Sequence, residues 1–122
     1  MNDIQAIDVH IHLVDEASIK ARGGRTEQMA RYMGYKLKVI SVDEMADQYR
    51  ERKMMAVLMN TTDASVTGLA PVPNDHIAAA VRKYPDVFLG FGIIDPWLGK
   101  LALQEIRRCK EELGLHGIGE FN

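Results

Sequence analysis

The sequence contains one cysteine, Cys109, and no apolar run close to the roughly 20 residues that cross a bilayer. A single thiol cannot form an internal disulfide, which favours a reducing, cytoplasmic environment. The N-terminus has no basic region before an apolar stretch, so we expect no signal peptide. The net charge is only −2, which gives no reason to expect a nucleic-acid partner. Because a G-x-G-x-x-G motif and a P-loop are both absent, we also set aside an open nucleotide-binding sheet.

Short apolar segments that alternate with helical patterns make up most of the 122 residues. We expect strands at 4–13, 54–61, 87–95 and 116–121. Helices are predicted after the Ser41–Glu44 capping box and at 75–84 and 98–113, with a short one starting at Thr26 inside the long segment 15–40. Strands joined by single helices run parallel. The sequence therefore predicts an α/β fold of the order β-α-β-α-β-α-β.

Two histidines, His10 and His12, lie one residue apart in the first predicted strand, "IDVHIHL". Side chains two apart on a strand share a face, so these imidazoles project together, with Asp8 beside them. At the carboxyl end of a buried parallel strand, such a pair forms half of a divalent metal site. The competing interpretation is a pair of hydrogen-bonded core or surface histidines.

A third ligand is needed, because catalytic zinc usually takes three protein ligands and keeps one open position. Glu120 is the best placed candidate, near the end of the fourth predicted strand. It is equally well explained as a surface carboxylate. His76 begins a helix and His116 begins the fourth strand, so both are worse placed.

Several further motifs occur in a fixed order along the chain. They are Tyr84-Pro85-Asp86, Gly90-Phe91-Gly92, Asp95-Pro96, Leu113-Gly114 and Gly117-Ile118-Gly119. Together with the H-x-H pair, this set resembles the N-terminal half of amidohydrolase family 2, the branch related to aminocarboxymuconate-semialdehyde decarboxylase.

The resemblance implies the first half of a (β/α)8 TIM-type barrel, with a metal at the carboxyl ends of its strands. His10 and His12 would then be ligands of a divalent ion, zinc or alternatively manganese, and Glu120 holds a position that some branches use for metal. The implied activity is a metal-dependent hydrolase or nonoxidative decarboxylase acting on a small carboxylate or carbonyl compound. Arg22 and Arg25 could hold the substrate carboxylate, or they belong to a solvated basic stretch.

A complete barrel of this type needs about 250 residues. Residues 1–122 therefore correspond to a single partial domain, and the family's later histidine and aspartate ligands have no counterpart in them. Four strands alone would leave two open edges and an uncovered face. We expect a homo-oligomer or a C-terminal half as partner. The alternative is a catalytically inactive half barrel that acts only through association.

Overall fold

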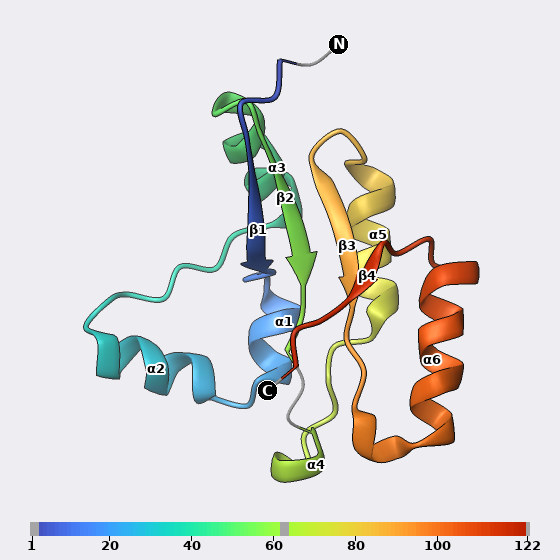
Figure 1. The fold of residues 1–122 in the computed structure, drawn as a ribbon. Coiled ribbons are helices and arrows are strands. Elements are labelled where there is room, and N and C mark those ends of the chain that lie inside the picture. The colour runs from blue at the N-terminus through green and yellow to red at the C-terminus, as the bar shows by residue number, and fades with distance from the viewer. Residues whose placement is uncertain (1–2, 62–63, 122) are drawn as a thin grey trace.

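The computed structural model describes residues 3–61 and 64–121, and Figure 1 shows their fold. The strands are β1 (Ala6–His12), β2 (Met54–Met59), β3 (Phe88–Gly92) and β4 (Gly117–Ile118). The helices are α1 (Glu16–Ala21), α2 (Arg25–Met33), α3 (Val42–Glu51), α4 (Ala64–Thr67), α5 (Asn74–Lys83) and α6 (Lys100–Glu111), with a 3-10 turn η1 (Pro96–Leu98). Within these described ranges, no helix is long and apolar enough to cross a membrane.

The four strands form one sheet in the order β1-β2-β3-β4, and each neighbouring pair is parallel. The predicted α/β architecture is therefore confirmed. Because parallel strands all point the same way, the segments that leave their carboxyl ends gather at one edge of the sheet, at the bottom of Figure 1.

The hydrophobic core lies between the sheet and the helices that cover one of its faces. Ala56 and Leu58 of β2 and Phe88 of β3 are at most 1% exposed, and they cluster with Met45 of α3 and Ile77 of α5. Burying a side chain of this size contributes about 1.5–3 kcal/mol. The apolar helix faces predicted from the 3.6-residue period are the faces that make this layer.

Strand β1 differs from the buried strand that its apolar sequence predicted. It is an edge strand, and Ile7 and Val9 are 49% and 70% exposed. A bulge also interrupts it, because two residues between Asp8 and Ile11 lie opposite the single residue between Ala56 and Leu58. The prediction that Asp8 shares the histidine face is therefore wrong. Its carboxylate accepts a hydrogen bond from Tyr49 of α3 instead.

The other departures are local. Helices α1 and α4 were not predicted, β4 is shorter than the expected 116–121, and η1 delays the start of α6 to Lys100. The Ser41 hydroxyl accepts from the Glu44 amide as predicted, but the Glu44 carboxylate binds Lys38 rather than completing the capping box. None of these differences alters the order of the strands.

Candidate metal centre

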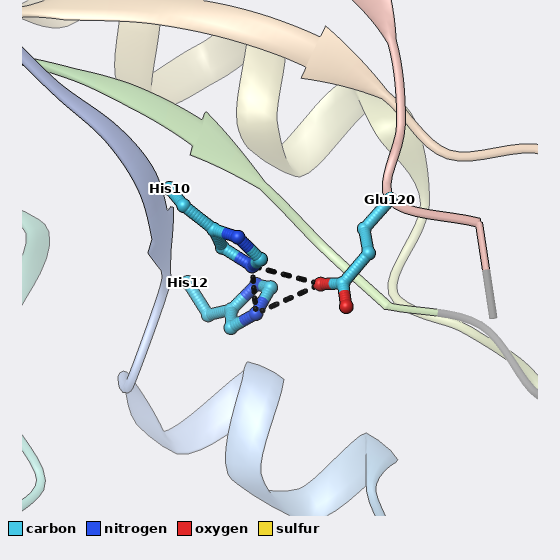
Figure 2. A group of neighbouring side chains, drawn as sticks. All are labelled: His10, His12 and Glu120. Carbon is cyan, nitrogen blue, oxygen red and sulfur yellow. Dashed lines mark hydrogen bonds and ion pairs between the residues drawn. The ribbon is translucent and has the colours of Figure 1, made fainter.

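Three side chains from opposite ends of the sequence meet on the open face of the sheet, as Figure 2 shows. The Nε2 atoms of His10 and His12 are 3.2 Å apart. One carboxylate oxygen of Glu120, Oε2, lies 2.9 Å from the first and 3.2 Å from the second. The two histidines and Glu120, which was one candidate for a third ligand, thus form a compact triangle of potential ligand atoms.

The dimensions of this triangle suit a divalent ion. Ligand atoms held about 2.0–2.2 Å from one ion lie about 3.0–3.5 Å apart in tetrahedral or octahedral arrangements. Two imidazole nitrogens and a carboxylate oxygen are also lone-pair donors that crowd one another unless a cation or proton lies between them. Both the spacing and the donor set therefore fit a metal ion bound by these three residues.

Local structure explains how the three ligands converge. His10 lies within the bulge of β1 and His12 follows it, and both rings turn to the face opposite the helix layer, where they lie edge to face. Beyond β4, the Gly119 amide donates to the Gly92 carbonyl at 2.9 Å, which extends the ladder, and the Glu120 side chain then points toward the two histidines (Figure 2). The site stays accessible, since the His10, His12 and Glu120 side chains are 53%, 27% and 28% exposed.

The orientation of His12 is set by the end of β2. Its Nδ1 lies 3.0 Å from the carbonyl oxygen of Met59. Because a carbonyl only accepts hydrogen bonds, Nδ1 is the nitrogen that carries the hydrogen. The neutral ring then presents the lone pair of Nε2 to His10 and Glu120, which is the tautomer that metal ligation requires.

Arg22 and Arg25 lie beside this cluster rather than in it. Both line a cavity of about 290 Å³, and His12 forms part of the same wall. The guanidinium of Arg22 donates to the Leu13 carbonyl, and burial lowers the pKa of Arg22. Arg25 is exposed at the start of α2. The hydrogen bond to Leu13 therefore holds the Arg22 guanidinium in the wall of this cavity.

The histidines that the sequence placed outside the site do lie outside it. His76 of α5 binds the Asp15 carboxylate at 2.6 Å, and the backbone amide of His116 pairs with Gly90. Asp15 also caps α1. Although burial opposes it, the hydrogen bonds from Ser18 and His76 hold the pKa of Asp15 below its ordinary value. This pair ties α1 to α5, and sequence analysis missed it.

Asn60 is a second residue that sequence analysis missed. It follows the last residue of β2 and lines the same cavity as His12 and Arg22. A polar residue directly after a buried strand was the available signal, and it is the same kind of signal that singled out Glu120.

A larger cavity, of about 850 Å³, lies between α5 and α6, and its wall includes Asp95 and Arg108. No ligand atom of the triangle lines it. Asp95 caps η1 by accepting a hydrogen bond from the Trp97 amide. The smaller cavity, not the larger one, shares His12 with the triangle.

Comparison with curated proteins finds a similar decarboxylase. Over 50 residues, the chain is 46% identical to the 2-amino-3-carboxymuconate-6-semialdehyde decarboxylase of Dictyostelium discoideum. That stretch is 41% of this chain and 14% of the relative.

Among solved structures, the fold is similar to that of a 2,6-dihydroxybenzoate decarboxylase, with a TM-score of 0.59 and 19% identity over 92% of this chain and 37% of that one. It is also similar to a dihydroxybenzoic acid decarboxylase from Polaromonas with bound manganese, with a TM-score of 0.55 and 24% identity over 92% and 36%. The 4-oxalomesaconate hydratase of Rhodopseudomonas palustris matches with a TM-score of 0.56 and 23% identity over 92% and 40%.

These alignments cover little more than a third of each solved chain, and the four parallel strands correspond to part of a TIM barrel. The Amidohydrolase family model matches residues 7–121. That match contains every ligand atom of the triangle and both arginines of the cavity. The chain belongs to the amidohydrolase family.

Proposed function

We propose that His10, His12 and Glu120 hold a divalent metal ion, manganese or zinc, and that this chain carries that part of the active site of a metal-dependent lyase or hydrolase. The observation that carries the proposal is the triangle of ligand atoms 2.9–3.2 Å apart. Manganese has support from a similar decarboxylase that binds it, and zinc from the nitrogen and oxygen ligands.

Within the amidohydrolases, we favour nonoxidative decarboxylation of a small unsaturated or aromatic carboxylate. The similar proteins named above are two kinds of decarboxylase and a hydratase, so carbon–carbon and carbon–oxygen lyases predominate among them. Hydrolysis remains the second candidate reaction, because the same kind of metal site also activates water.

The residues of the proposed site have distinct tasks. A bound divalent ion supplies a Lewis acid that polarises a carboxylate or carbonyl oxygen. The Met59 carbonyl keeps the Nε2 of His12 directed at the centre, and Glu120 adds a negative charge that favours a cation. Arg22, with Arg25 at the cavity mouth, pairs with the substrate carboxylate.

The remaining strands of the barrel and the further ligands are proposed to come from additional polypeptide or from a second copy of this chain. The exposed apolar residues of edge strand β1, Ile7 and Val9, support such a covering partner. The same exposed edge favours the alternative of an inactive half barrel that works through association alone. We further propose a cytoplasmic protein, since its thiol, Cys109, is buried and unpaired.

Metal content of the purified, untagged chain tests this function. Elemental mass spectrometry is expected to find about one manganese or zinc ion per chain or per dimer. His10→Ala or His12→Ala should lower metal affinity more than about a hundredfold, beyond the loss typical of changing a residue that only hydrogen-bonds to a ligand. His116→Ala, which changes an exposed histidine away from the triangle, should retain the metal. Unchanged metal stoichiometry in both ligand variants would refute the assignment.

A further inference from the structure

Asn60 is a buried amide that makes no side-chain hydrogen bond to the described part of the chain. Its side chain is 2% exposed, and neither Oδ1 nor Nδ2 bonds to any residue that the structure describes. Buried polar groups in folded proteins are nearly always paired, because leaving one unpaired forfeits the hydrogen bonds it made to water. Two atoms of one side chain that bond to no described residue therefore call for a further partner, and a bound ligand can supply one.

A second asparagine shows how this fold treats a structural amide. Asn74 is almost as buried, at 4% exposed. Its Nδ2 donates to the Ile93 carbonyl and to Glu105, both at 2.8 Å, and its Oδ1 accepts from the Ile93 amide at 2.7 Å. These three hydrogen bonds join α5 to Ile93, the residue after β3, and to Glu105 of α6. Asn60 directly follows the carboxyl end of β2, as Ile93 directly follows that of β3, but its side chain hydrogen-bonds to no described residue.

The surroundings of Asn60 point to a small ligand. It lines the 290 Å³ cavity together with His12 and Arg22, so a molecule held there lies against one of the proposed metal ligands. The hydroxyl oxygen of Thr26, in the same wall, is also buried and unpaired. The volume is at the small end of the range for ligand pockets, about 300–1,000 Å³, which suits a compact acid.

Charge and hydrogen bonding divide between two residues of this cavity. The Arg22 guanidinium provides the positive charge that a carboxylate requires. The amide of Asn60 provides an NH2 donor group, a carbonyl acceptor and no charge, so it matches a neutral substituent such as a hydroxyl or carbonyl. Both amide atoms are buried. Because neither hydrogen-bonds to a described residue, rotating the side chain toward the cavity breaks no such hydrogen bond.

We propose that Asn60 is a specificity residue that recognises a hydroxyl or carbonyl group next to the carboxylate of the substrate. The substrate class is accordingly a hydroxy- or oxo-substituted carboxylic acid rather than an unsubstituted one. This inference rests on the proposed function, because it takes the cavity beside His12 as the substrate site.

Calorimetric titration of the manganese-loaded chain with two probes, 2,6-dihydroxybenzoate and benzoate, tests the proposal. The wild-type chain should bind the hydroxylated acid at least about tenfold more tightly, as expected for one well-made hydrogen bond in a buried site. Asn60→Leu should remove that preference and leave benzoate affinity within about twofold. It should not lower the melting temperature, because leucine removes two unpaired polar atoms while conserving most of the volume.

Asn74→Leu is the matched control, and it should lower the melting temperature while keeping the wild-type preference between the probes. The proposal is overturned if the wild-type chain shows no preference, if Asn60→Leu keeps it, or if Asn60→Leu melts lower, as for an amide paired with buried water. His10→Ala separates the two proposals. If His10→Ala abolishes metal binding but keeps the preference for the hydroxylated acid, the Asn60 assignment holds independently of the metal site. If the wild-type chain binds metal normally but shows no such preference, only the Asn60 assignment is refuted.

Discussion

The two halves of the sheet differ in how fully they satisfy their own polar groups. Around β3, Arg108 of α6 donates to both Asp75 and Glu105, and Asn74 completes the network. Around β1 and β2, His10 is half exposed and Asn60 is unpaired. A buried polar group that makes no hydrogen bond destabilises a fold unless a ligand pairs with it, and an exposed imidazole is free to meet a ligand. The comparison indicates a scaffold on the α5–β3–α6 side and a binding site on the β1–β2 side.

The largest effect that sharpens this contrast is expected at Asn74. Asn74→Leu removes three hydrogen bonds and leaves the Ile93 amide and carbonyl buried without partners, so we expect a loss of about 3 kcal/mol in the free energy of unfolding. Urea denaturation measures it. Asn60→Leu, its counterpart on the other side, should change the same quantity by less than about 0.5 kcal/mol. Equal losses in the two variants would erase the distinction.

Packing on the scaffold side should tolerate little added volume. A methyl group at Gly90 would lie 2.6 Å from a Leu115 methyl carbon and 2.9 Å from one of Val81, so Gly90→Ala should cost about 2 kcal/mol. Gly24→Ala is the control. It faces open space at a φ of +79°, so only backbone strain of about 1 kcal/mol is expected. A smaller loss at Gly90 than at Gly24, in thermal or urea unfolding, would show that the β3 layer is loosely packed.

On the β1 side, the hydrogen bond from Tyr49 to Asp8 spans 2.9 Å and connects α3 to the bulged strand. Tyr49→Phe should cost about 1 kcal/mol at neutral pH. Burial, followed by the nearby Asp8 carboxylate, raises the pKa of Tyr49 to about 12.

The pH dependence of that contact has a definite sign. An unfolded tyrosine ionises near pH 10, so the folded chain resists a deprotonation that the unfolded chain undergoes. The contribution of Tyr49 is therefore complete below pH 10 and is lost as the pH rises from 10 toward 12. Urea unfolding of wild-type and Tyr49→Phe chains at pH 8, 10 and 11 checks this. A parallel decline in both chains would contradict it.

The smallest effect is expected from Glu105. Hydrogen bonds from Arg108, and then one from Asn74, hold the pKa of Glu105 below its ordinary value. Its stabilising contribution is thus present above about pH 4.5 and is lost as the pH falls further. Because the side chain is 31% exposed, we expect less than about 1 kcal/mol.

Glu105→Gln should accordingly flatten the decline in stability between pH 5 and 3, measured by urea unfolding. Glu27→Gln, at an exposed glutamate of α2, serves as the control. If stability declines between pH 5 and 3 as steeply in Glu105→Gln as in the wild-type chain, the Arg108 network contributes no stability of this kind.

Local pattern was sufficient for much of the architecture. The capping serine Ser41, the apolar faces of α3 and α5 and the short apolar strands depend on neighbours within a few residues, so sequence spacing predicts them. The same holds for the shared face of His10 and His12. It fails for Asp8, because a bulge adds one residue to β1 and reverses the alternation.

What the sequence by itself determined is the parallel α/β order, the paired imidazoles at the end of β1 and the membership in the amidohydrolase family. Tertiary structure alone decided that Glu120, 110 residues from His10 along the chain, comes within 2.9 Å of it. It also decided that Asn74 finds three partners while Asn60 finds none. Periodicity specifies which way a side chain points, but the distance between two strands, and what fills it, is set only when their helices pack.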